Sequence, residues 1–230
     1  MNRLQKHPSP PLWLLAAVHL VLFAAGLGGS AALAHGAVFP SPFDAGAASA
    51  YFGAHADAVR VAGFFLAGSA VPLGLFAATA ASRLTFFGAE VAGVTIALFG
   101  GIAASLMLLS SGLCMWGLGQ LGAEAVPQAV RALHLLAFAT GGPGFSMMFG
   151  LLVLGVSLAG VLAVSGSRRL PRWLLWFGLV LGVVAELSSL SLLSNTAAFL
   201  LPLVRFPGFV WLIAVGVTMP TARVPRKPEA

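Results

Sequence analysis

The sequence predicts an all-α membrane protein, in which residues 1–230 form a single transmembrane bundle of six helices with both termini in the cytoplasm. Hydrophobic residues make up 59% of the chain and charged residues only 8%, whereas soluble domains carry about 25% charged residues. Nearly uncharged stretches of about 20 residues, the length that crosses a ~30 Å hydrocarbon core, recur along the whole chain. These stretches are continuous, whereas the strands of a transmembrane β-barrel alternate over about 10 residues.

The apolar stretches define six spans, and the charges at their ends define the orientation. We place the spans at roughly 12–34, 60–82, 89–117, 132–164, 172–194 and 198–219. Nine of the twelve lysines and arginines fall on one side: Arg3, Lys6, Arg83, Arg168, Arg169, Arg172, Arg223, Arg226 and Lys227. Because cytoplasmic connections are enriched in lysine and arginine, this side is predicted to be cytoplasmic. An even number of spans also requires both termini to lie on one side.

The first span has an alternative interpretation as a cleaved secretory signal. Arg3 and Lys6 precede the apolar run and Ala32-Leu33-Ala34 follows it, which is the charge pattern and small-residue site of such a signal. The run is longer than the ~7–15 apolar residues of a signal peptide, so we favour a retained span. The orientation of the later spans is the same in both cases.

The longest connection, residues 35–59, is predicted to lie outside the cell. It begins with Pro-Ser-Pro and continues as an Ala-rich stretch that holds Tyr51, Phe52, His55 and Asp57. We favour an ordinary loop packed on the helix ends. The alternative is a short helix at the outer membrane interface, where tyrosine and phenylalanine are common.

Several function classes are disfavoured by the sequence. The net charge of +6 is typical of nucleic-acid binding, but these cations cluster at span ends, where they set orientation, so we expect no nucleic-acid partner. Cys114 is the only cysteine, which excludes an internal disulfide and a multi-cysteine metal site, and we expect it to be a small buried hydrophobe. No P-loop, dinucleotide fingerprint or zinc signature is present. We therefore expect no cofactor, no metal and no catalytic residues.

Glu186 and Arg205 are opposite charges inside the last two spans. A charge at mid-bilayer costs a few kcal/mol on insertion scales and persists mostly where it is paired or hydrated. At the helical rise of ~1.5 Å per residue, both lie about 10–12 Å below the outer ends of their spans. We therefore expect them to pair or to share a polar network, either as a structural clamp between two helices or as part of a ligand or ion site.

Small residues on the fifth span predict close helix packing beside Glu186. Gly178, Gly182 and Glu186 recur every four residues, and Ser189 continues their stripe. Small residues at this spacing let helix backbones approach each other in a membrane.

Helix breaks occur in the two neighbouring spans. Pro202 and Pro207 flank Arg205 and each removes an amide donor. The tetrad Gly141–Gly144 contains a proline and interrupts the fourth span about 9 Å from its outer end. Broken helices at a common depth are typical of transporter binding sites, although many kinks serve only packing.

The histidines are weak candidates for a haem or metal site. His19 lies near the inner end of the first span and His134 at the outer end of the fourth, more than about 10 Å apart along the membrane normal, so a shared haem is disfavoured. Five residues are predicted to face outside and carry ligand groups suited to zinc or copper: His35, His55, Asp57, Glu124 and His134. Of these, His55 and Asp57 alone have close spacing, so solvated loop residues are the favoured interpretation.

Over most of its length, the chain resembles a group of uncharacterised bacterial six-helix integral membrane proteins of the domain-of-unknown-function kind. The resemblance lies in Leu170-Pro171-Arg172-Trp173, in Glu186, in Arg205-Phe206-Pro207-Gly208-Phe209 with Trp211-Leu212-Ile213, and in HLLAFATGG at 134–142. It implies a six-span fold in the bacterial cytoplasmic membrane and offers no activity.

Together these features predict a protein that binds or transports a small ligand or ion in an outward-facing polar pocket between spans four, five and six. The predicted ligand-binding residues are Glu186, Arg205, Ser189, His134, Gly141 and Gly144. The alternative is a structural or partner-binding membrane protein in which the two charges clamp the helices. An intramembrane enzyme or redox protein is third. The expected partner is the lipid bilayer, and a homo-oligomer stays open.

Overall fold

A computed structural model describes residues 5–121, 126–162 and 170–223, and it contains six helical segments long and apolar enough to cross a membrane. These segments are Leu12–Leu33, Ala56–Phe86, Ala92–Leu118, Pro127–Leu162, Arg172–Leu192 and Asn195–Thr218. The predicted all-α bundle of six spans is confirmed. The bounds differ from the predicted ones by a few residues, most at the second and fourth spans. The predicted orientation is untested, and several cations that carry it lie outside the described residues: Arg3, Arg168, Arg169, Arg226 and Lys227.

The helices follow the chain in a simple order. They are α1 (Leu12–Leu33), α2 (Ala45–Ala54), α3 (Ala56–Phe86), α4 (Ala92–Leu118), α5 (Pro127–Ala139), α6 (Phe145–Leu162), α7 (Arg172–Leu187) and α8 (Leu200–Thr218). A π-helical turn, Thr140–Gly144, joins α5 to α6, and 3₁₀ turns Ser188–Leu192 and Asn195–Phe199 connect α7 to α8. Two short strands, β1 (Gln5–Lys6) and β2 (Ala222–Arg223), pair antiparallel near the chain ends.

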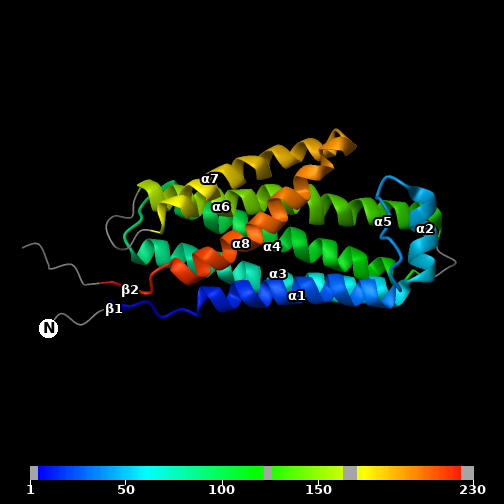
Figure 1. Ribbon diagram of the computed structural model, residues 1–230, viewed down its shortest axis with the longest axis horizontal. Helices are drawn as coiled ribbons and strands as arrows, with labels where there is room; N and C mark the ends of the chain where they lie inside the picture. Colours follow the sequence, from blue (N-terminus) through cyan, green and yellow to red (C-terminus); the bar gives the residue numbers. More distant parts are fainter. Residues whose placement is uncertain (1–4, 122–125, 163–169, 224–230) are drawn as a thin grey trace, which may run out of the picture.

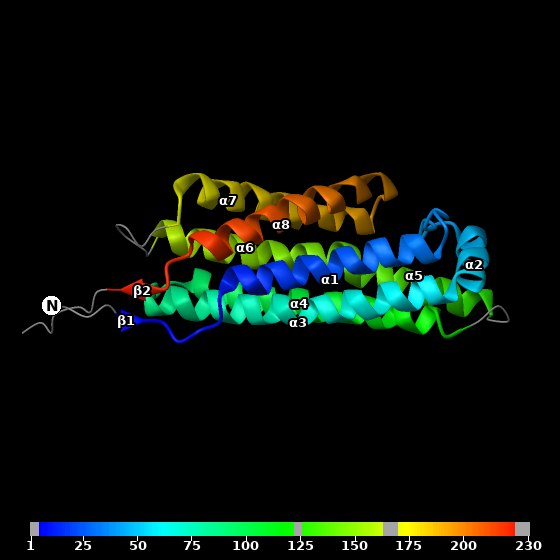
Figure 2. The same ribbon diagram turned by 60° about the horizontal axis from the view of Figure 1, so that its bottom comes forward.

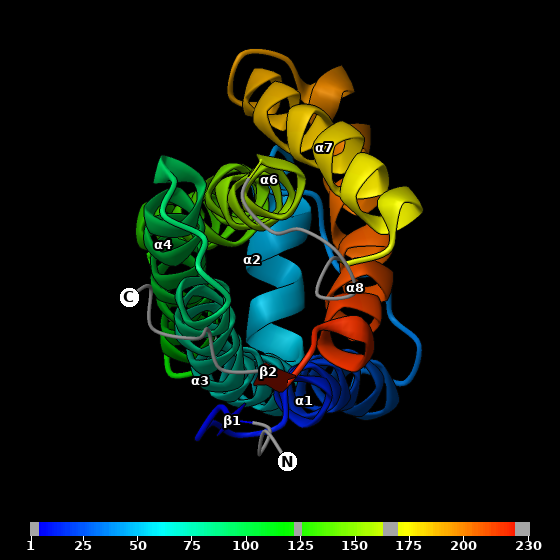
Figure 3. The ribbon, with the colours of Figure 1, turned by 90° about the vertical axis from the view of Figure 1, so that its left-hand side faces the viewer.

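The spans form a ring in the order α1, α3, α4, α6, α7 and α8, as the view along the bundle shows (Figure 3). Both strands lie at one end of the bundle, which we name the terminal end (Figures 1 and 2). The helix α2 crosses the opposite end, which we name the α2 end. The helices of the ring thus run from an end with two short strands to an end crossed by α2.

Close approaches at glycines hold the middle of the ring together. A Cβ atom added to Gly112 on α4 would lie 2.8 Å from Cα of Ala67 on α3. A Cβ at Gly100 on α4 would lie 2.6 Å from the backbone nitrogen of Leu152 on α6. Such contacts place backbone against backbone, which is how small residues favour helix association in membranes.

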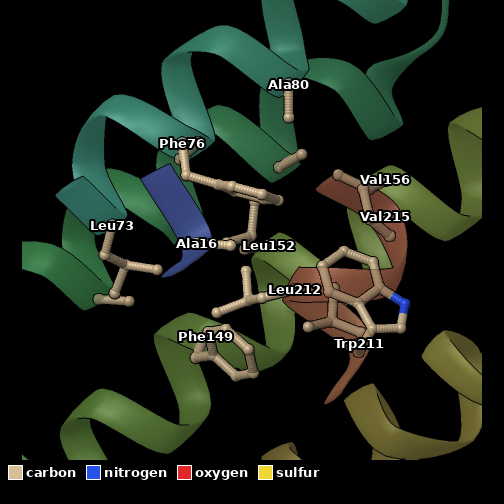
Figure 4. Close-up of a cluster of buried hydrophobic side chains, with 14 of the residues drawn as sticks. Ala16, Leu73, Phe76, Ala80, Phe149, Leu152, Val156, Trp211, Leu212 and Val215 are labelled. Carbon is tan, nitrogen blue, oxygen red and sulfur yellow. The ribbon is translucent and has the colours of Figure 1, made fainter. Parts of the chain in front are cut away.

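A cluster of large buried side chains fills the part of the ring nearer the terminal end (Figure 4). Phe76 of α3, Phe149 and Leu152 of α6 and Trp211 of α8 are each at most 1% exposed. Their burial against one another closes the interior of the bundle on this side. The largest side chains of the interior thus leave more space toward the α2 end than beside this cluster.

The connection between the first two spans contains the helix α2, so the favoured prediction of an ordinary loop was wrong and the short-helix alternative is correct. The Asp44 carboxylate accepts a hydrogen bond from the Ala47 amide at 3.0 Å, which caps the first turn. Phe52 on α2 is 2% exposed and packs in a cluster with Val130 and Ala137 of α5. An N-cap residue and one buried aromatic anchor therefore order a segment that has no long apolar run.

At the terminal end, Arg83 joins the N-terminal segment to α3. Its side chain is 2% exposed, its Nε donates to Ser9 Oγ at 3.0 Å, and its Nη2 donates to the Pro10 carbonyl at 2.8 Å. Next to it, the His7 Nε2 lies 3.1 Å from Ser82 Oγ. Arg83 thus has a defined structural role at this end.

We expect Arg83→Met to release the segment that contains Lys6. Hydrogen bonds to a charged group contribute about 1.5–3 kcal/mol, so their loss should speed local opening about tenfold or more. The rate of tryptic cleavage after Lys6 measures this opening. Arg172→Met is the matched control, because Arg172 is an exposed arginine at the start of α7. Equal cleavage rates in the two variants would contradict the role of Arg83.

Stability should also depend on pH through His7. Burial and the positive charge of Arg83 lower the pKa of His7 below its ordinary value of 6.5. The unfolded state therefore binds the proton first as the pH falls, so the free energy of unfolding should fall as the pH drops through 6.5 and level off below the folded pKa. Unfolding measured between about pH 8 and about pH 5 tests this. The dependence of the free energy of unfolding on pH should be weaker in His7→Gln. An unchanged dependence in this variant would exclude His7 as its source.

Candidate functional site

A cavity of about 660 Å³ lies near the α2 end, among α1, α3, α4, α5 and α8. Aromatic side chains form much of its wall: Phe23, Phe39, Phe138 and Phe206. A few polar groups interrupt this apolar surface: Ser30, Tyr51, Ser111, His134 and Arg205. Cavities of this size with few polar groups are typical of small-molecule sites.

Arg205 is the charged group of the cavity. The neighbouring buried residues Val204 and Gly208 turn one face of α8 into the core, and Arg205 projects from the adjacent face. Its Nη2 donates a hydrogen bond to the Gly141 carbonyl. The guanidinium carbon lies 4.7 Å from the ring centre of Phe145 and 5.2 Å from that of Phe23, within the range of cation–π contacts.

The π-helical turn Thr140–Gly144 supplies the carbonyl that Arg205 binds, so the predicted helix break is a real irregularity. Such turns inside α-helices often occur at functional sites. Gly141 also lets α4 come close, because a Cβ there would lie 2.9 Å from Cβ of Ser111. Ser111 Oγ in turn donates to the Ala137 carbonyl at 2.8 Å. Irregular backbone at membrane depth is tolerated where it borders a cavity, as it does here.

No acidic side chain lines the cavity in the part of the chain that the structure describes. Within those residues the single ion pair joins Arg60 to Asp57, at the start of α3. Arginine stays protonated in proteins. The cavity therefore contains a positive charge that is balanced by one carbonyl and two aromatic faces, and by no carboxylate.

The predicted pair of Glu186 and Arg205 is not formed. Glu186 faces α6, where a Cβ added to Gly150 would lie 2.9 Å from its Oε1, and this oxygen is buried with no hydrogen-bond partner. Arg205 instead binds at Gly141. These two contact points are nine residues apart, or about 13 Å by the helical rise. Equal depths of the two backbones did not bring the side chains together, because they extend toward different neighbours.

The predicted packing stripe on α7 does contact α6. A Cβ at Gly182 would lie 2.6 Å from Cδ2 of Leu154, and one at Gly178 would lie 2.6 Å from Nε1 of Trp211 on α8. Ser157 Oγ and Trp211 Nε1 both lie beside Gly178 and are buried with no hydrogen-bond partner. Glu186 Oε1, also without a partner, lies farther along α7, beside Gly150. This stripe is a packing surface and not part of the cavity wall.

Three of the six predicted ligand-binding residues meet at the cavity: Arg205, His134 and Gly141. The other three lie elsewhere. Glu186 faces α6, Ser189 lies in the 3₁₀ turn after α7, and Gly144 packs near Met107, whose Sδ would be 3.2 Å from an added Cβ. The pocket was predicted between spans four, five and six, but the first, second, third, fourth and sixth spans line it. The fifth span is outside it because α7 packs on α6.

The other wall residues have no distinct signal in the sequence. Phe23, Leu27 and Ser30 lie on one face of α1 at spacings of four and three residues. A lipid-facing stripe has the same pattern, so sequence alone does not separate the two. Ser111 and Phe138 were likewise ordinary residues of apolar runs.

His134 is a buried polar residue of the cavity wall. It is 3% exposed, and its ring packs edge-on to Phe52 and Phe39, with centres 4.9 and 5.6 Å apart. Its Nδ1 is buried with no hydrogen-bond partner. In the described ranges no three histidine, cysteine or acidic residues gather as a metal site, and Glu124 lies outside them. His19 Nδ1 lies 2.8 Å from the Ser69 carbonyl, as in a structural histidine.

No protein-family model, curated protein or solved structure matches this chain. The resemblance to the bacterial six-helix family therefore stays a prediction. The functional proposal rests on the geometry around Arg205.

Proposed function

We propose that this multi-pass membrane protein binds a small amphipathic molecule, with an anionic head group on Arg205 and an apolar body against the aromatic walls of the cavity. The observation that carries the proposal is the guanidinium of Arg205, which lies at an apolar cavity with no carboxylate partner among the described residues. We further propose that the terminal end faces the bacterial cytoplasm, since Lys6, Arg83 and Arg172 lie there.

The energetics of the charge favour an anionic ligand. An arginine near the centre of a membrane helix costs about 2.5–3.5 kcal/mol on insertion scales. A guanidinium has five N–H donors, and the Gly141 carbonyl accepts from one nitrogen of Arg205. A carboxylate or phosphate group matches the remaining donors, and bidentate pairing makes such contacts strong.

The shape of the bundle favours binding over conduction. The buried cluster around Phe76, Phe149 and Trp211 fills the interior on the terminal side of the cavity. The cavity is therefore a dead end in this conformation. Its volume of about 660 Å³ falls within the ~300–1,000 Å³ of small-molecule sites.

The rival function is a structural one, in which Arg205 merely ties α8 to the turn after α5. The hydrogen bond to Gly141 favours this reading, whereas the clamp between Glu186 and Arg205 has lost its support. An enzyme is third, because the polar residues at the described cavity wall do not form a nucleophile and base pair.

The proposal is tested with two probes of the same chain length, the anion tetradecanoate and the neutral alcohol tetradecanol, added to the protein in phosphatidylcholine nanodiscs. We expect tetradecanoate to raise the unfolding temperature, since a ligand at 100 times its Kd stabilises by about 2.7 kcal/mol. Tetradecanol should have a much smaller effect. Arg60→Gln, which alters an arginine that already has a carboxylate partner, should respond like the wild type. Equal shifts with both probes would overturn the anion site.

A further inference from the structure

We infer that the ligand reaches Arg205 sideways from the bilayer, between α1 and α8, and is a single-chain lipid with an anionic head group. This inference rests on the proposed function and adds the source and class of the ligand. It follows from the three borders of the cavity, which lie on the lipid side, at the α2 end and toward the terminal end. The exposure and packing of the wall residues differ among these borders.

The helices α1 and α8 touch at the terminal end and separate toward the α2 end. A Cβ at Gly216 on α8 would lie 2.8 Å from Cα of Trp13 on α1. From this crossing α8 runs away from α1 and reaches α7 at the other end of the bundle (Figure 1). The parts of α1 and α8 that are nearer the α2 end both line the cavity, which therefore extends into the space between these two helices.

The border between these helices faces lipid. Leu27 of α1 and Phe206 of α8 both line the cavity, yet they are 60% and 56% exposed. Each lies six residues from the end of its helix at the α2 end, or about 9 Å by the helical rise. This depth falls within the acyl chains of one leaflet of a ~30 Å hydrocarbon core. An acyl chain can thus contact the mouth of the cavity directly.

Aromatic contacts narrow the other two borders. At the α2 end, Phe39 lines the cavity, is 47% exposed and packs edge-on against Tyr51 and Phe52, with ring centres 5.4 and 5.8 Å apart, and the next residue, Pro40, is buried. Toward the terminal end, the rings of Phe145 and Phe149 stack with centres 5.5 Å apart. These contacts leave the lipid side as the favoured route.

The size of the cavity selects one chain. A water molecule occupies about 30 Å³ in the liquid, and a methylene group is of similar size, so 660 Å³ holds about 22 such groups. A fatty acid or lysolipid chain fits this number, whereas the two chains of a phospholipid exceed it. The positive charge of Arg205 then selects an anionic head among such molecules.

The test uses an octadecanoic acid with a mid-chain diazirine, supplied in phosphatidylcholine vesicles that contain the full chain. Flash photolysis after increasing times, with labelled peptides identified by mass spectrometry, gives the rate of arrival. We expect label on the cavity segments 23–31 and 133–142. Leu27→Trp, which narrows the lipid-side border, should slow labelling several-fold, and Leu27→Ala should speed it.

Matched variants separate the routes. Val21→Trp changes an exposed residue of α1 that does not line the cavity, and it should label like the wild type. Ala37→Trp narrows the water side, because Ala37 lies in the loop before α2 and borders the cavity. If Ala37→Trp slows labelling and Leu27→Trp leaves the labelling rate unchanged, lateral access is overturned and the ligand arrives from water.

The same experiment separates failure of this inference from failure of the proposed function. Cavity labelling that is lost in Arg205→Met but insensitive to Leu27 variants overturns the lateral route and keeps the anion site. Cavity labelling that is equal in Arg205→Met and wild type overturns the anion site itself. Competition by inorganic phosphate as strong as that by unlabelled octadecanoate would overturn the lipid class. Unfolding temperatures of all variants confirm that each one is folded.

Discussion

Arg205→Met is expected to weaken binding of tetradecanoate strongly, while it changes the free energy of unfolding of the unliganded protein by no more than about 1 kcal/mol. The two effects have different origins. Methionine removes the cost of a charge in an apolar cavity, but it also leaves the Gly141 carbonyl without the guanidinium. An unsatisfied buried acceptor costs about 1–3 kcal/mol, and the removed charge offsets a similar amount.

Binding should respond much more strongly than folding. A hydrogen bond to a charged group contributes about 1.5–3 kcal/mol, so the Kd for tetradecanoate should rise about 10- to 100-fold or more. Thermal unfolding with and without the probe measures both effects on the same samples. Arg60→Gln again serves as the control, because it removes an arginine whose charge is already balanced by Asp57.

The structural rival predicts the reverse pattern. If Arg205 only ties α8 to Gly141, Arg205→Met should lower stability by several kcal/mol, and tetradecanoate should shift wild type and variant alike. That outcome would assign Arg205 to the fold. Charge-swapped variants at positions 186 and 205 should not restore stability in either case, because these side chains contact different neighbours.

Gly112→Ala is expected to destabilise the bundle strongly for a change of a single methyl group. The added Cβ would lie 2.5 Å from the backbone nitrogen of Ala67 and 2.8 Å from its Cα. Backbone atoms cannot rotate away, so α3 and α4 must separate along their contact. Overpacking in a core costs about 1–3 kcal/mol, and we expect the upper end of this range or more. Denaturant unfolding in detergent measures the loss.

Gly28→Ala is the matched control for this prediction. Gly28 lies inside α1, and nothing lies within 4 Å of an added Cβ. Alanine is favoured over glycine in helices by about 0.8–1.0 kcal/mol, so this variant should be as stable as the wild type or slightly more stable. Similar stabilities for Gly112→Ala and Gly28→Ala would show that the contact between α3 and α4 relaxes freely.

The sequence predicted the irregular turn at Gly141–Gly144 and three of the residues that line the cavity, but it assigned Arg205 the wrong partner. The turn was predictable because glycine and proline act on their own backbone. The partner of Arg205 was not predictable. Two residues expected at equal depth on neighbouring helices can still extend their side chains in different directions. A helix turns by about 100° per residue, so small changes in rotation or tilt exchange one neighbour for another.

The helix α2 also depends partly on local sequence and partly on tertiary contacts. The Asp44 cap and the Ala-rich stretch allow a helix, yet burial of Phe52 against α5 is what stabilises it. That contact joins residues about 80 positions apart in the chain, and no local pattern reports it.

The sequence by itself determined the class of protein, the six spans and the irregular turn in the fourth span, because these depend on hydropathy and backbone chemistry within windows of about 20 residues. The breaks predicted at Pro202 and Pro207 were wrong, because α8 continues through both prolines as one helix. The tertiary structure alone decided that α1 and α3 line the cavity, that α7 does not, and that Arg205 faces this cavity without a carboxylate. The physical reason is that lipid-facing and cavity-facing residues are equally apolar in a membrane helix, so packing alone distinguishes them.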